Sequence, residues 1–213
     1  AAAERYFQAL ADGDATAATA MTFDPDSDLF DSTYLIDDVL GAATERISDV
    51  KVTALNDPLV GPKHKVEVSY TLAGERHQSS LHLKEVEPTW VFLRNWKIHE
   101  AFATTLAVDR DSLTQLTLGG EVIEGDATYI QLFPAVYPVA LTEPELFTAD
   151  STELVMNGVD DHDFVTINPT AELQTIVQSQ VNGLVSNCAA ATPTSTRAIE
   201  GCSLYLHLER GGD

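Results

Sequence analysis

Cys188 and Cys202 are the only cysteines of this 213-residue chain. Three kinds of chemistry are open to such a pair: a disulfide, a redox couple or part of a metal site. A zinc site needs about four ligands, with cysteines commonly two to four residues apart, whereas thirteen residues separate these two and His207 is the only imidazole near them. A redox couple usually has C-x-x-C spacing at a helix N-terminus. Cys188 is expected at a helix C-terminus, where the helix dipole opposes a thiolate.

A structural disulfide between Cys188 and Cys202 is therefore the favoured interpretation. It would tie the end of a helix to the start of a final strand. Closing a loop of this length contributes about 3 kcal/mol in the chain-entropy model. Because disulfides persist outside the cytosol, the pair predicts an exported protein.

The acidic stretch "DPDSDLFD" could bind a hard cation. Its aspartates are Asp24, Asp26, Asp28 and Asp31. Alternating carboxylates can supply several of the oxygens that Ca²⁺ prefers, but the EF-hand pattern fails, because Leu29 stands where glycine is needed and Leu35 where glutamate is needed. A solvated acidic turn is the favoured interpretation. A Ca²⁺ site is its alternative, and it would imply a Ca²⁺-dependent adhesion domain.

The six histidines are scattered along the chain. His162 lies within "DDHD", whose carboxylates would raise the pKa of an imidazole, but no nucleophile or substrate pocket can be assigned to it. The sequence has no Walker-type phosphate loop, no G-x-G-x-x-G, no H-E-x-x-H and no G-x-S-x-G. No cofactor and no particular reaction are therefore predicted, and a non-enzymatic role is favoured.

The charge balance excludes nucleic acid as a partner. Twelve lysines and arginines stand against 33 aspartates and glutamates, a formal net charge of −21. Phosphate backbones require basic surface, and an anionic membrane surface would repel this chain. The excess of acid favours solubility and would suit a cationic partner or divalent ions.

The length fits one large domain or two domains of about 100 residues each. The chain begins "AAAERYF" without an initiating methionine, and no apolar run approaches the ~20 residues of a membrane span. We therefore expect a soluble fragment of a protein that is anchored in the membrane by a segment removed from it. Direct membrane insertion by this fragment is not expected.

The chain is expected to begin with two helices. Tyr6, Phe7 and Leu10 recur at helical spacing, and Asp12-Gly13 is a plausible stop. Asp14 can then cap a second short helix that runs through Met21. A third short helix or an irregular arm is expected before Ser48.

From Ser48 the hydrophobic period changes to two, which is typical of half-buried antiparallel strands. In "KVEVSYTL" one predicted face holds Val66, Val68, Tyr70 and Leu72, and the other holds Lys65, Glu67, Ser69 and Thr71. Turns are predicted at Ala73-Gly74 and at Glu87-Pro88. Three or four long consecutive strands are therefore expected.

The second half should contain short strands and one amphipathic helix. Gly119-Gly120 and Asn157-Gly158 predict turns. Pro134 and Pro138 favour an edge, a bulge or short irregular strands over a central strand. Asn168 can cap the helix, with Pro169 at its first position and an end near Asn187. Its apolar stripe comprises Leu173, Ile176, Val177, Gln180/Val181, Leu184 and Cys188. We expect this helix to pack on a sheet and the strand "SLYLHL" to follow it.

The order of elements over residues 1–107 resembles the NTF2-like (cystatin-like) fold. The resemblance rests on "YFQALADGDATAA", with its AL-x-x-GD pattern, and on the closing "NWKI" strand. It implies a curved antiparallel sheet around N-terminal helices and a cavity between them. On the strand that would run beside the cavity, alternation places Trp96 and His99 on opposite faces. Tyr34, Asp37 and Asp38 could reach the cavity, but they match no catalytic pattern.

Residues 108–213 resemble a module of uncharacterised actinobacterial cell-envelope proteins. The resemblance rests on "LFPAVYPV", on the "NPTAELQ" helix and on the paired cysteines. The whole is then an α+β chain with an NTF2-like domain over 1–107 and a small β-rich domain with one helix over 108–213.

The expected function is binding, sensing or scaffolding at the cell envelope, outside the cytosol. The partner would be an unidentified protein or small molecule. The alternative is a small-molecule carrier or an enzyme that uses the NTF2-like cavity. A deep cavity with a few converging polar groups would favour this alternative, and a cavity filled by Phe, Trp and Leu side chains would favour the interaction module.

Overall fold

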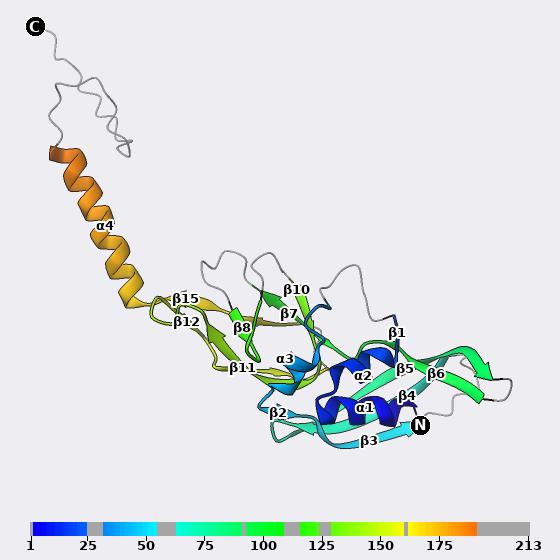
Figure 1. Cartoon of the computed structure of the whole chain (residues 1–213). Helices are drawn as coiled ribbons and strands as arrows, with labels where there is room; N and C mark the ends of the chain where they lie inside the picture. Colours follow the sequence, from blue (N-terminus) through cyan, green and yellow to red (C-terminus); the bar gives the residue numbers. More distant parts are fainter. Residues whose placement is uncertain are drawn as a thin grey trace, which may run out of the picture.

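A computed structural model describes residues 2–24, 32–54, 63–90, 93–108, 116–123, 129–159 and 162–190. The fold is mixed α+β (Figure 1). The helices are α1 (Ala2–Asp12), α2 (Ala15–Ala20), α3 (Asp37–Gly41) and α4 (Ala171–Ala190). The first strands are β1 (Thr22–Asp24), β2 (Glu45–Arg46), β3 (Ser48–Ala54), β4 (Lys63–Leu72), β5 (Glu75–Trp90), β6 (Leu93–Glu100) and β7 (Thr104–Val108). The later ones are β8 (Leu116–Leu118), β9 (Glu121–Val122), β10 (Tyr129–Leu132), β11 (Ala135–Leu141), β12 (Phe147–Ala149), β13 (Glu153–Met156), β14 (His162–Val165) and β15 (Ile167–Pro169).

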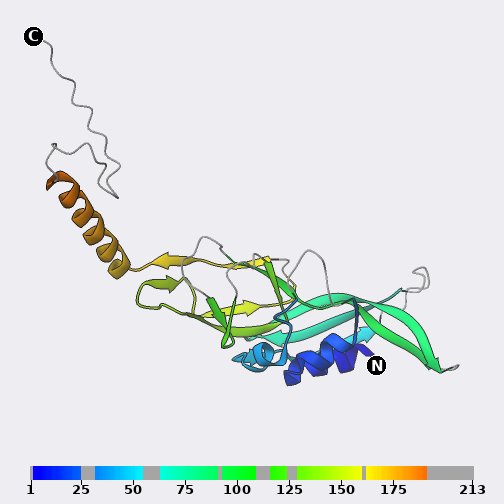
Figure 2. The same cartoon turned by 45° about the horizontal axis from the view of Figure 1, so that its top comes forward.

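The two N-terminal helices form as predicted. The apolar positions of α1 that recur at helical spacing are fully buried, and the chain turns at Gly13 with a positive φ of 84°. Asp14 is the N-cap of α2, and its carboxylate accepts a 2.7 Å hydrogen bond from the backbone N–H of Ala17. Both helices lie on one face of the main sheet (Figures 1 and 2).

The main sheet has five strands in the order β1-β6-β5-β4-β3. Its strands are antiparallel apart from β1, which pairs with β6 in parallel. The predicted alternation in β4 is confirmed, because Val66, Val68, Tyr70 and Leu72 are buried while Lys65 and Glu67 are exposed. The hairpin turn at Ala73-Gly74 is confirmed as well, with both residues at positive φ.

The turn predicted at Glu87-Pro88 is wrong. Strand β5 continues through this dipeptide to Trp90, and the chain reverses between Trp90 and Leu93. The register of β5 against β6 shifts between Val86 and Trp90. A proline has no N–H for a regular ladder, and an irregularity of this kind is where a strand accommodates one.

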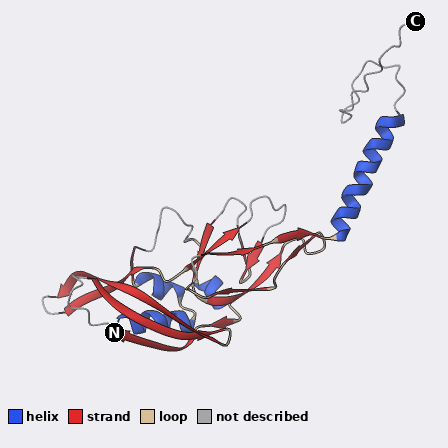
Figure 3. Cartoon of the chain, turned by 180° about the vertical axis from the view of Figure 1, so that it is seen from behind, coloured by secondary structure: helices blue, strands red, loops and turns tan. Residues whose placement is uncertain are grey.

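Within the described residues the second half is built on three further sheets, whose short strands are visible in Figure 3. Strand β7 lies between β10 and β14 in the first, and β12 pairs with β15 in another. The third has the order β13-β11-β8-β9, with β2 pairing to β11 as well. The predicted turns at Gly119-Gly120 and Asn157-Gly158 are confirmed by positive φ at Gly119, Gly120 and Gly158.

The prediction that the proline-containing strand is not a central one is wrong, because β11 lies between other strands on both sides. One neighbour, β13, pairs with Ala135 to Pro138. On the opposite side β2 pairs with Ala135 and Val136, and β8 pairs with the strand from Val139 onward. Pro138 therefore lies between two successive partners on that side, where its missing N–H interrupts no ladder.

One buried hydrophobic cluster extends through both halves, from Ala3 to Val165. Across it, the Tyr70 hydroxyl donates to the backbone carbonyl of Asn157, and the Gly158 N–H donates to Thr104 Oγ1 at 3.0 Å. The two regions therefore pack on one another through shared core. The division into domains 1–107 and 108–213 stays a prediction, and strand β7 extends across its boundary.

Helix α4 does not pack on a sheet as predicted, because none of its residues is buried. It points away from the rest of the molecule (Figures 1 and 3). Its apolar stripe is exposed, with Leu184 at 56% and Val177 at 50%. The N-cap of α4 also differs from the predicted one, because Asn168 and Pro169 belong to β15. Thr170 Oγ1 instead accepts a hydrogen bond from Leu173 N–H at 3.4 Å. Among the described helices, none is long and apolar enough to cross a membrane.

Candidate functional site

Aromatic side chains fill the space between the N-terminal helices and the main sheet. Phe7 makes T-shaped contacts with Tyr6 and Phe102, with ring centroids 5.4 and 5.3 Å apart. Phe102 also packs on Tyr70 at 5.9 Å, and Tyr70 stacks on His77 at 5.6 Å. Tyr6, Phe7 and Tyr70 are fully buried. In the part of the chain that the structure describes, this region is therefore packed core.

The hydroxyl groups of the two buried tyrosines form hydrogen bonds with backbone groups. The Tyr6 hydroxyl accepts a 2.8 Å hydrogen bond from the N–H of Phe102, and Tyr70 donates to the Asn157 carbonyl. Burial raises the pKa of both tyrosines above the ordinary value, because an ionised phenol would lose its hydration there. Both hydroxyls therefore stay neutral and structural at ordinary pH.

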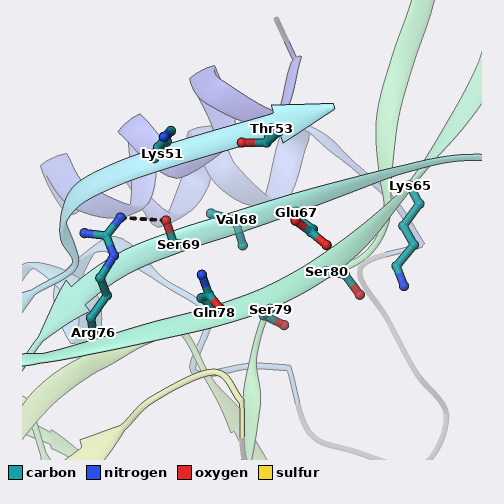
Figure 4. A pocket seen from close by; sticks show the side chains of 10 residues that line it. All are labelled: Lys51, Thr53, Lys65, Glu67, Val68, Ser69, Arg76, Gln78, Ser79 and Ser80. Carbon is teal, nitrogen blue, oxygen red and sulfur yellow. Dashed lines mark hydrogen bonds between the residues drawn. The ribbon is translucent and has the colours of Figure 1, made fainter. Parts of the chain in front are cut away.

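The opposite face of the main sheet is polar and forms a concavity of about 520 Å³ (Figure 4). Its lining residues are Lys51, Thr53, Lys65, Glu67, Val68, Ser69, Arg76, Gln78, Ser79 and Ser80. Figure 4 looks onto this face, with the helices behind the sheet. The register of β3, β4 and β5 brings the residues together, since Lys51 pairs with Ser69 and Ser69 with Gln78.

Cations from three strands surround the concavity. Lys51 lies on β3, Lys65 on β4 and Arg76 on β5, and all three are exposed. Arg76 Nη2 donates a 2.7 Å hydrogen bond to Ser69 Oγ, which tethers the guanidinium beside β4 (Figure 4). The remaining N–H groups of Arg76 can bind an acceptor from solvent. This arrangement can attract an anion and hydrogen-bond to it, and we take it as the candidate binding site.

The residues proposed to reach an NTF2-like cavity take structural positions. Tyr34 is buried in the main hydrophobic cluster, and the Asp38 side chain is exposed at the start of α3. The Asp37 carboxylate accepts two 2.8 Å hydrogen bonds from Thr16, one from the backbone N–H and one from the hydroxyl. These bonds, the backbone one first, hold the pKa of Asp37 below its ordinary value. Asp37 thus ties α3 to the first turn of α2.

Asp37→Asn should flatten the acid dependence of stability. Because the folded pKa of Asp37 lies below the unfolded one, its contribution is complete above about pH 4 and is lost as the pH falls through the folded value. Urea unfolding from pH 7 down to about pH 2.5 measures the slope. An unchanged slope in Asp37→Asn would contradict the assignment.

The other residues singled out in the sequence give no cluster. Asp24 ends β1, and Asp26, Asp28 and Asp31 lie outside the described residues. Among the described residues no group of three or more His, Cys, Asp or Glu could hold a metal ion. His162 begins β14, and His207 falls outside the described part of the chain.

The disulfide stays a prediction. Cys188 lies in the last turns of α4, near the predicted helix end, and no described cysteine is free. Its expected partner Cys202 and the strand "SLYLHL" lie outside the described residues.

Sequence reasoning missed the concavity, although part of its signal was present. The polar positions Lys65, Glu67 and Ser69 were placed on one face of β4, which the structure confirms. Their neighbours Lys51 and Gln78 depend on strand register, which the alternation alone does not specify. Trp96 and His99 are both half-buried on β6.

No protein-family model, curated protein or solved structure matches this chain.

Proposed function

We propose that this chain is a non-enzymatic binding or scaffolding module of an anchored cell-envelope protein. In this proposal it acts outside the cytosol and binds through the polar face of its main sheet, called the uncovered face because no described helix lies on it. The NTF2-like fold of residues 1–107 is part of the proposal. Helices on one face of a five-stranded sheet are compatible with such a fold.

The packed interior is the observation that carries the proposal. Phe7, Tyr70 and Phe102 occupy the space between helices and sheet where the alternative function would need a ligand. Binding from the opposite face requires no rearrangement of this core. The concavity there lies within the usual size range of small-molecule sites, about 300–1,000 Å³.

Two further features support a role in interaction at the envelope. The predicted Cys188–Cys202 disulfide favours an oxidising compartment. The exposed apolar side chains of α4 are typical of proteins that associate with others.

A nuclear magnetic resonance titration of the labelled chain with solubilised cell-envelope material tests this function. We expect shifts in the amides of β3, β4 and β5 around Lys51, Ser69 and Gln78. The aromatic ring signals of Phe7 and Phe102 should stay in place. Movement of these ring signals would support the cavity alternative, and a spectrum without any shifts would contradict a binding function.

A further inference from the structure

The concavity on the uncovered sheet face concentrates cations in a strongly acidic protein. Of the twelve lysines and arginines in the chain, three line this one site, against the single carboxylate of Glu67. The chain as a whole has a net charge of −21. The local sign of charge is therefore opposite to that of the molecule, and an anion is the ligand that such a local field attracts.

The cations are arranged around neutral hydrogen-bonding groups. Arg76 and Lys65 lie toward opposite ends of the concavity in Figure 4, and Gln78 lies between them. Arg76 is held by Ser69 Oγ at 2.7 Å, so its guanidinium is tethered beside β4. A guanidinium tethered by one hydrogen bond keeps further N–H groups with which it can bind phosphate or carboxylate oxygens. The amide of Gln78 can exchange hydrogen bonds with hydroxyl groups of the same ligand.

From these features we infer that the concavity binds a small anionic sugar, one that bears a phosphate or a carboxylate. The mostly polar lining disfavours an apolar ligand, and hydroxyl groups on the ligand would satisfy Gln78 and the neighbouring serines. A volume of about 520 Å³ accommodates a unit of this size.

Long polyanions fit less well than small ones. A nucleic acid or an anionic membrane would extend beyond the concavity and meet the acidic surface of the remaining chain. The screening length is about 8 Å at physiological ionic strength, so a small ligand interacts mainly with the three local cations. The negative charge of the surrounding surface therefore favours small anions over long polyanions, while the three local cations favour anions over other ligands.

Glu67 is expected to weaken anion binding, in contrast to the three cations. Its carboxylate lies among the lining residues, between Val68 and Ser80 in Figure 4. It repels the anionic group of the ligand while the three cations attract it. Removing this carboxylate should tighten binding, and removing the Arg76 charge should weaken it.

The test titrates the purified chain with glucose 6-phosphate, glucuronate, inorganic phosphate and glucose at constant ionic strength. We expect the two anionic sugars to bind more tightly than phosphate and glucose to give no saturable shift. Arg76→Gln should weaken glucose 6-phosphate binding about three- to tenfold. Glu67→Gln should strengthen it about two- to threefold.

Matched controls change the same charge elsewhere. Arg5→Gln removes an exposed cation on α1, across the sheet, and Glu121→Gln removes an exposed carboxylate on β9. Both should bind as the wild type does. The inference is overturned if glucose binds as well as glucose 6-phosphate, or if Arg76→Gln and Arg5→Gln bind equally.

This inference rests on the proposed binding function and names a ligand class for its site. The inferred ligand class and the proposed function can fail independently, because the sugar titration uses pure components and the function test uses envelope material. No binding of the defined sugars, together with envelope-dependent shifts on β3 to β5, would overturn the ligand class alone. The absence of envelope-dependent shifts would overturn the envelope function alone.

Discussion

Replacing Gly158 with alanine is expected to lower the free energy of unfolding by about 3 kcal/mol. Gly158 has a positive φ of 73°, and a Cβ there would lie 2.7 Å from Pro134 Cγ and 2.8 Å from Phe102 Cε1. Two costs therefore add, about 1 kcal/mol for the left-handed backbone and about 1–3 kcal/mol for overpacking a filled core. Urea unfolding at 25 °C measures the difference.

Gly74→Ala is the matched control for this substitution. Gly74 has nearly the same φ, 75°, but a Cβ at this position would have no other atom within 4 Å. Only the backbone cost of about 1 kcal/mol remains there. If both variants lost the same stability, the close packing of the Asn157-Gly158 turn against Phe102 and Pro134 would be contradicted.

Replacing Phe102 with alanine is expected to lower the free energy of unfolding by about 3–5 kcal/mol. Its ring packs between Phe7 at 5.3 Å and Tyr70 at 5.9 Å, and it also meets the Gly158 turn. Loss of the ring would leave a cavity that joins the helices, the main sheet and the second half. The free energy of unfolding in urea gives the magnitude.

Phe147→Ala controls for the loss of a buried phenyl ring. Phe147 is 8% exposed and Phe102 is 7% exposed, but Phe147 lies on β12 and outside the main hydrophobic cluster. We expect Phe147→Ala to cost at least about 1.5 kcal/mol less than Phe102→Ala. Equal costs would contradict the central position of Phe102 in a core shared by both halves.

The N-terminal helices and the buried face of β4 were predictable because their signals are local. Helical spacing at Tyr6, Phe7 and Leu10 and a capping group at Asp14 act within a few residues of chain. The alternation from Lys65 to Leu72 reports burial on one face, and the structure has that face buried. Patterns of this kind are sufficient to predict helices and strands and to predict which face of each is buried.

The wrong predictions for Pro138 and for α4 concern positions whose structure depends on segments far away in the sequence. Pro138 fits into the central strand β11 because β2 and β8 occupy successive stretches of one side, and these partners lie far away in the sequence. The apolar stripe of α4 indicated burial against a sheet, but it contained no information on whether this chain supplies one. The cationic concavity likewise depends on the registers that join Lys51, Ser69 and Gln78.

We propose that the uncovered sheet face binds a component of the cell envelope. Co-sedimentation with isolated envelopes tests it most directly, in a form that does not depend on ligand charge. Ser80→Trp places a bulky ring in the concavity, and Thr148→Trp places the same ring at an exposed position of β12 as the matched control. We predict that wild type and Thr148→Trp are retained equally and that Ser80→Trp is retained at least about fivefold less. Equal retention of all three proteins would contradict the claim.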